Sequence, residues 1–90
     1  MKIVFHHRTH RIVLARGVLC TTLSIDGKLF DSCCGLSRTQ FAPFTLCGAI
    51  EEENGSVDSV HVRVAPHLFF DMITMRCANS PAQTKRVSWL

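Results

Sequence analysis

Two dipeptides, Asp26-Gly27 and Asn54-Gly55, constrain the fold of this chain most strongly, because apolar and β-branched runs flank each of them. Both central residues of a two-residue type I′ turn need a positive φ, which glycine, asparagine and aspartate tolerate. The first dipeptide joins "VLCTTLSI" to "KLFDSCC", and the second joins "FTLCGAIEEE" to "SVDSVHVRV". From Val60 to Val64 valine alternates with a polar residue, which indicates a strand with one buried and one solvent-exposed face. The sequence therefore predicts two β-hairpins.

The segment 66–78 has the features of a helix. Pro66 suits a first helical position, and Asn79 and Pro81 suit a helix end. At 100° per residue its apolar side chains cover an arc of about 220°, wider than the roughly 100° stripe of a surface helix. Such a helix is either buried deeply against the sheet, or it packs one flank on the sheet and turns the other to a partner. The tail "KRVSWL" is either an added edge strand or a frayed end with Trp89 docked.

The predicted fold class is therefore α+β. We expect a small antiparallel sheet from two β-hairpins with one helix (about 66–78) packed on it, in a single domain of residues 1–90. A chain of this size buries only roughly 60–65% of its unfolded surface. Hydrophobic residues nevertheless make up 47% of the chain and charged residues only 19%, against about 25% charged in typical soluble domains. Some apolar surface must stay exposed, and such surface usually marks an interface.

This surplus predicts a protein-binding module or a homo-oligomer. Two groups of contact residues are expected, one on the helix and a second, electrostatic one near the N-terminus. The residues are Phe69, Phe70, Met72, Met75 and Arg76 on the helix, and Arg8 and Arg11 in the second group.

The N-terminal "MKIVFHH" is too short and too polar for a signal-peptide core. No run approaches the roughly 18 apolar residues that span a bilayer. We therefore expect a cytoplasmic protein with no membrane partner, in which thiols stay reduced.

The five cysteines are expected to be structural. If Asp26-Gly27 is a two-residue loop, Cys20 faces Cys33 at a non-hydrogen-bonded position, near enough to bridge in an oxidising setting. In a reducing cytosol the two would be packed thiols. Zinc is an alternative, since His6 and His10 have a spacing that occurs in zinc sites. Its further candidate ligands are Cys20, Cys33, Cys34 and Cys47.

No C-x-x-C pair supports the zinc alternative, so neither a metal nor another cofactor is expected. Catalysis is not expected either. In the expected register Cys47 pairs with Val62 and meets no histidine on its own face, and Cys77 lies at the wrong end of a helix dipole for thiolate stabilisation. Paired carboxylates, a glycine-rich phosphate loop and a Ser/His/Asp arrangement are also missing from the sequence pattern.

Positive charge is concentrated in the N-terminal quarter. The net charge is +3, and residues 1–25 hold four basic residues and three histidines but no acid. This basic hairpin could contact nucleic-acid backbone, an acidic protein surface, or only solvent. The acidic run from Glu51 to Glu53 and the lack of tyrosine for base stacking argue against nucleic acid.

The predicted function is that of a small cytosolic accessory or regulatory protein that binds another protein as an inhibitor or modulator. Compact domains of this kind are common among phage and mobile-element proteins. A nucleic-acid-binding regulator that uses the basic N-terminal hairpin is the alternative, and a small zinc-binding domain is a further one.

Overall fold

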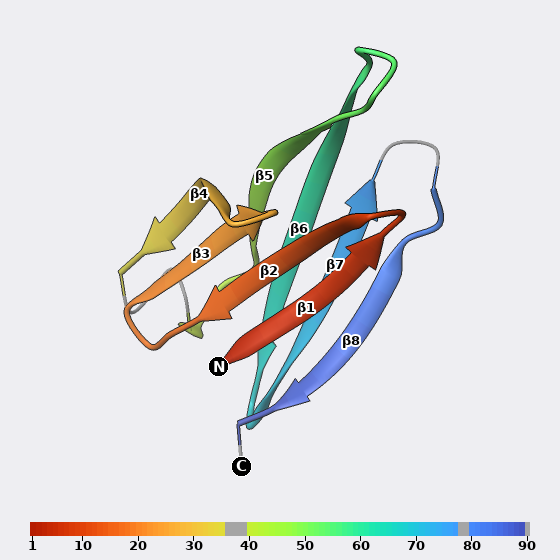
Figure 1. Cartoon of the computed structure of the whole chain (residues 1–90). Coiled ribbons are helices and arrows are strands. Elements are labelled where there is room, and N and C mark those ends of the chain that lie inside the picture. The colour runs from red at the N-terminus through yellow and green to blue at the C-terminus, as the bar shows by residue number, and fades with distance from the viewer. Residues whose placement is uncertain (36–39, 78–79, 90) are drawn as a thin grey trace.

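The computed structural model describes residues 1–35, 40–77 and 80–89. Over these residues the chain forms eight strands: β1 (Lys2–His7), β2 (His10–Arg16), β3 (Cys20–Ile25), β4 (Lys28–Cys34), β5 (Phe44–Glu51), β6 (Val57–His67), β7 (Phe70–Cys77) and β8 (Gln83–Ser88). They build two four-stranded antiparallel sheets, ordered β1-β2-β3-β4 and β5-β6-β7-β8. The two sheets lie one over the other as layers (Figure 1).

Each sheet is a simple up-and-down meander, so every strand pairs with its neighbour in sequence. The edge strands of the two sheets meet on both sides of the sandwich. On one side β4 contacts β5, and on the other β8 lies alongside β1 (Figure 1). There the Gln83 side chain donates to the carbonyl of His6 at 2.9 Å, and Lys85 donates to the carbonyl of Val4. These side-chain bonds cover the exposed backbone of β1, which would otherwise offer an open edge.

A single hydrophobic core lies between the layers. The alternation from Val60 to Val64 is confirmed, because Val60, Val62 and Val64 are all fully buried. The other buried members are Ile3, Phe5, Ile12, Leu14, Leu23, Ile25, Cys33, Leu46, Ile50, Ile73, Met75 and Cys77. In β1, β2, β3, β6 and β7 alternate residues are buried, as expected for sheets that each bury one face.

The Asp26-Gly27 turn is confirmed as a two-residue loop, with φ of 50° and 83° at its two residues. The expected pairing beyond it is wrong by one residue, because the register shifts between Leu23 and Ser24. Cys20 consequently faces Cys34 instead of Cys33. A bulge of this kind inserts one unpaired residue and cannot be read from the turn dipeptide.

The second hairpin is also confirmed, but its loop is longer than two residues. Glu51 pairs with Val57, and the loop is closed by a hydrogen bond from the Glu52 amide to the Ser56 carbonyl at 2.8 Å. This changes the register by one residue, so that Cys47 faces His61 instead of Val62.

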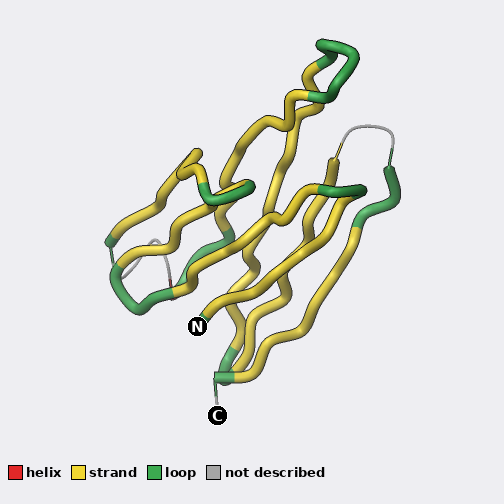
Figure 2. The backbone as a smooth tube through the Cα atoms, in the orientation of Figure 1, coloured by secondary structure: helices red, strands yellow, loops and turns green. Residues whose placement is uncertain are grey.

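The expected helix over 66–78 is wrong, and the α+β class is wrong with it. Residues up to His67 belong to β6, a tight turn follows, and β7 starts at Phe70. Figure 2 shows strand on both sides of this turn. In β7 the side chains of Asp71, Ile73, Met75 and Cys77 face the core, and the intervening ones do not.

The physical reason is that apolar residues occupy both parities of this segment, so a period of two fits them as well as a period of 3.6. The arc of about 220° was already too wide for one helical stripe. The first sheet buries one whole face, which a second apolar layer must cover, and the long β6–β7 hairpin forms the centre of that layer.

The tail forms an edge strand, which confirms one of the two alternatives. β8 pairs with β7, and beyond it Trp89 donates its amide to the Phe69 carbonyl at 2.8 Å. Among the described residues, none forms a helix with the length and apolar character needed to cross a membrane.

Candidate functional site

The contact residues predicted from the sequence do not form one surface. Phe69 is exposed in the β6–β7 turn, whereas Met75 is 1% exposed and belongs to the core. Phe70 and Met72 are half-buried and Arg76 is exposed, all three on the outer face of β7. Strand geometry separates them, because successive side chains point to opposite faces. Met75 therefore belongs to no contact surface.

Arg8 and Arg11 lie at the opposite end of the sandwich, next to the β3–β4 and β5–β6 turns. Arg8 Nη1 is 3.3 Å from Glu52 Oε1. Asp26 accepts the Arg11 amide at 2.9 Å and lies 2.6 Å from His10 Nδ1. We call this region the charged end and define it by Arg8, His10, Asp26 and Glu52.

Hydrogen bonding sets the protonation of the charged end. The hydrogen bond to Asp26 raises the pKa of His10 above its ordinary value. The Arg11 amide and then His10 lower the pKa of Asp26. Asp26 and Glu52 thus each have a cationic or N–H neighbour, so the charges of Arg8 and His10 are partly offset within the fold.

Exposed apolar side chains gather at the other end, in the β2–β3 loop, the β6–β7 turn and the segment before β5. We call this the apolar end. Its members are Val18 (57% exposed), Leu19 (63%), Phe41 (77%), Leu68 (78%) and Phe69 (57%). All but Leu19 line one open hollow of about 450 Å³. Gln40 donates to the carbonyls of Gly17 and Val18 at 3.2 and 3.1 Å, which holds the segment before β5 against the β2–β3 loop.

A buried ion pair lies beneath the apolar end and joins the two sheets. Arg16 at the end of β2 donates from Nε to Asp71 Oδ2 in β7 at 2.9 Å, and from Nη1 to Thr21 at 3.0 Å. Trp89 Nε1 donates to the same carboxylate oxygen at 2.9 Å. The guanidinium also lies 5.4 Å from the ring centroids of Phe44 and Trp89, within cation–π range. The side chains of the pair are 0% and 1% exposed.

A disulfide joins Cys20 to Cys34 at the apolar end, with Cα atoms 4.1 Å apart. The expectation of packed thiols between Cys20 and Cys33 is therefore wrong. The bulge in β3–β4 brings Cys34 into the facing position, and Cys33 is a buried thiol instead. The bridge fixes the start of β3, from which the β2–β3 loop leaves.

A thiol–imidazole contact on the outer face of the second sheet was not expected from the sequence. Cys47 Sγ lies 3.4 Å from His61 Nδ1, and both residues are exposed. His61, Arg63 and Arg76 contribute to an open hollow of about 420 Å³ on this face. Knowing that the β5–β6 loop runs from Glu52 to Ser56 would have revealed the pair, since that register alone places the two residues opposite each other.

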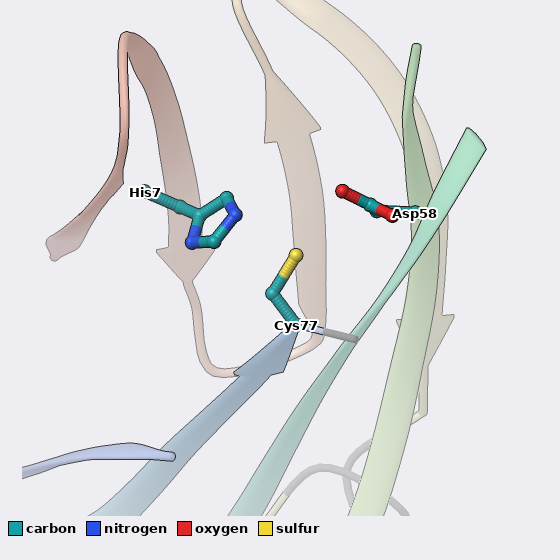
Figure 3. Close-up of side chains that lie close together, drawn as sticks. All are labelled: His7, Asp58 and Cys77. Carbon is teal, nitrogen blue, oxygen red and sulfur yellow. The ribbon is translucent and has the colours of Figure 1, made fainter. Parts of the chain in front are cut away.

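Within the described part of the chain, the residues considered for zinc are not brought together. Cys20 and Cys34 form the disulfide at the apolar end, and His10 bonds to Asp26 at the charged end. A different trio converges instead: His7, Asp58 and Cys77 place one nitrogen, one oxygen and one sulfur within 4.8 Å of one another (Figure 3).

Comparison with known protein families, curated proteins and solved structures found no match to this chain.

Proposed function

We propose that this chain is a small accessory or regulatory protein that binds another protein through its apolar end. The observation that carries the proposal is the clustering of five large apolar side chains, each 57–78% exposed, on neighbouring loops. Together they offer on the order of 500 Å² of apolar surface, the size of the largest patch on a typical monomer, which is often functional.

The strands that carry the loops of the apolar end are cross-linked, which favours binding. The Arg16–Asp71 pair and the Cys20–Cys34 disulfide fix the strands from which the loops leave. Leu68 and Phe69 form a two-residue turn between paired strands, and Phe69 has a φ of 73°. A surface ordered before binding loses less conformational entropy on association than a flexible one.

Charge indicates which kind of protein fits this surface. Asp71 is the second residue of β7, directly after the β6–β7 turn, and it is buried and paired with Arg16. Lys2 and Arg86 are exposed near the rim, where Arg86 lies 4.1 Å from the ring centroid of Phe70. The complementary partner is an apolar protein segment flanked by carboxylates, since opposite charges around an apolar centre favour encounter and register.

The nucleic-acid alternative gains no such support. Arg8 lies 3.3 Å from Glu52, and the rest of the acidic run from Glu51 to Glu53 surrounds the same end. A phosphate backbone would meet these carboxylates as well as the arginines, and like charges repel.

The cytoplasmic location is part of the proposal and depends on the state of the disulfide. A reducing cytosol would keep Cys20 and Cys34 as thiols, whereas an oxidising compartment would preserve their bridge. No catalytic step is proposed.

Selection from a random peptide library on the purified protein tests the proposed function. We expect enriched peptides to carry a large apolar residue next to Asp or Glu. Fluorescence polarisation should show binding at least about tenfold weaker for Leu68→Asp, equivalent to about 1.4 kcal/mol.

The matched control is Leu29→Asp, because Leu29 is also exposed (62%) but lies in β4 beside the Asp26-Gly27 turn, at the other end of the molecule. Its affinity should equal that of the wild type. Three outcomes would overturn the proposal: no enrichment, equal weakening by both variants, or a wild-type dimer in light scattering that Leu68→Asp converts to monomer. The last would mean that the surface serves self-association.

A further inference from the structure

Three potential metal ligands from both sheets meet near the charged end of the sandwich. His7 ends β1 in the first sheet, while Asp58 near the start of β6 and Cys77 at the end of β7 belong to the second. Each offers one ligand atom, and all three atoms lie within 4.8 Å of one another. Figure 3 shows the imidazole ring of His7 on one side, with the Cys77 sulfur and the Asp58 carboxylate across from it.

The imidazole of His7 provides an independent indication of a ligand. The residue is only 8% exposed, and its Nε2 atom is buried without a hydrogen-bond partner among the described residues. Most buried polar side-chain atoms in native proteins have a partner, and an unmet one costs free energy. A bound ion is one of the few arrangements that removes this cost, since a ring nitrogen can donate its lone pair to a metal.

We propose that His7, Asp58 and Cys77 bind a zinc ion. Imidazole nitrogen, thiolate sulfur and carboxylate oxygen are the three ligand types that Zn²⁺ takes in proteins. Ca²⁺ and Mg²⁺ prefer all-oxygen sites, so the nitrogen and sulfur of this trio disfavour them. Tetrahedral zinc with bonds of about 2.0–2.3 Å separates its ligand atoms by about 3.3–3.7 Å. Because no two ligand atoms of the trio are more than 4.8 Å apart, each pair needs to approach by at most about 1.5 Å.

Charge balance also suits zinc. On binding, the Cys77 thiol loses its proton to solvent, the thiolate and the Asp58 carboxylate each contribute one negative charge, and the ion contributes two positive ones. The resulting site is neutral, which suits its partly buried position between the sheets. Three protein ligands leave a fourth position for water.

The location assigns the ion a structural role in the fold. At the apolar end the Arg16–Asp71 pair already joins the first sheet to the second. The proposed ion would join β1 to β6 and β7 near the other end, and so would hold both ends of the sandwich together. Residues 7, 58 and 77 are far apart in sequence, so no ligand-spacing motif announces the site.

Cobalt titration of the chelator-treated full chain tests the proposal, with the Cys20–Cys34 disulfide kept intact. We expect a near-ultraviolet thiolate-to-cobalt charge-transfer band that saturates at about one equivalent of Co²⁺ and disappears when Zn²⁺ is added. Cys77→Ser should abolish the band. Cys47→Ser is the matched control and should retain it, because Cys47 belongs to the other Cys–His contact, with His61 at 3.4 Å.

Asp58→Asn guards against a folding artefact, because Asp58 is only partly buried whereas Cys77 lies in the core. This variant should fold by far-ultraviolet circular dichroism and bind Zn²⁺ at least about tenfold more weakly by calorimetry, since even outer-shell changes weaken metal sites 10–100-fold. In the wild type, Zn²⁺ should also raise the melting temperature and slow alkylation of Cys77. A folded wild type without a cobalt band, unchanged zinc affinity in Asp58→Asn, or a band lost in Cys47→Ser but kept in Cys77→Ser would each overturn the site.

Discussion

Replacing Asp71 with asparagine tests whether the buried ion pair beneath the apolar end holds the two sheets together. The Asp71 carboxylate accepts hydrogen bonds from Arg16 and from Trp89, both at 2.9 Å. Asparagine keeps the shape and one carbonyl oxygen but removes the negative charge. Because the arginine side chain stays protonated in proteins, the variant would retain a cation that is 2% exposed without a counter-charge.

The expected loss in free energy of unfolding is large compared with the total stability of a chain this short. Breaking one partner of a buried pair typically costs about 3–5 kcal/mol. A chain of 90 residues has a total free energy of unfolding of about 5–14 kcal/mol. At roughly 4–8 °C per kcal/mol for a domain of this size, the melting temperature of Asp71→Asn should fall by about 12–40 °C.

Urea unfolding measured by circular dichroism and by fluorescence provides the assay. Trp89 is the single tryptophan of the chain and donates directly to Asp71, so its emission reports on the pair itself. The control is Asp26→Asn, since Asp26 belongs to an exposed pair whose loss should cost no more than about 1 kcal/mol. The double variant Arg16→Met/Asp71→Leu should recover much of the loss, because apolar replacements avoid the buried charge. A free energy of unfolding for Asp71→Asn within about 1 kcal/mol of that of the wild type would refute the reasoning.

Three further perturbations have defined outcomes. The pKa of His10 is raised by Asp26. While Asp26 is ionised, the stabilisation from this pair is therefore present below pH 6.5 and is lost as pH rises through the folded-state pKa of His10. The difference in melting temperature between wild type and Asp26→Asn should therefore shrink between pH 6 and pH 9, and a constant difference in thermal scans would contradict this. Reduction of the Cys20–Cys34 bridge, whose sequence separation is 14, should lower the free energy of unfolding by about 3 kcal/mol in urea titrations, as the loop-entropy model gives. A Cys20→Ser/Cys34→Ser variant that unfolds at the same urea concentration as the wild type would exclude this. In Gly48→Ala the new Cβ would lie 2.8 Å from Ile25 Cδ1 and 3.3 Å from Phe30 Cβ. We therefore expect the crowding to lower the free energy of unfolding by about 1–3 kcal/mol in urea titrations. A variant as stable as the wild type would show that this contact adjusts freely.

Local signals in the sequence were sufficient for the two hairpins that contain Asp26-Gly27 and Asn54-Gly55. The Asp26-Gly27 turn and the valine alternation in β6 depend on neighbouring residues only, and the structure confirms both. The hairpin around Asn54-Gly55 is confirmed too, but its loop runs from Glu52 to Ser56 instead of spanning two residues. The β6–β7 hairpin could not be recognised locally, because Leu68 and Phe69 are not turn-forming residues. Phe69 has its φ of 73° in a turn closed by the pairing of His67 with Phe70, and its carbonyl accepts the Trp89 amide. Such strand pairing is what a local pattern does not report.

Register explains why the candidate sites were missed. A slip of one residue moves every side chain to a new partner. The bulge in β3–β4 exchanges Cys33 for Cys34 opposite Cys20, and the longer β5–β6 loop exchanges Val62 for His61 opposite Cys47. The trio of His7, Asp58 and Cys77 depends further on how one sheet lies over the other. Such long-range placement leaves no periodic or spacing signal in the chain.

The two proposed sites should act independently, because they lie at opposite ends of the same strands. Asp58 and His67 both belong to β6, and nine residue steps at about 3.4 Å separate them by about 30 Å. Val60, Val62 and Val64 between them are fully buried, so a shift of β6 that coupled the two ends would have to repack the core. Zinc binding at His7, Asp58 and Cys77 would therefore change the fraction of folded molecules but not the shape of the apolar end. Well below the melting temperature, removal of the metal should leave the affinity for an acidic-flanked apolar segment unchanged.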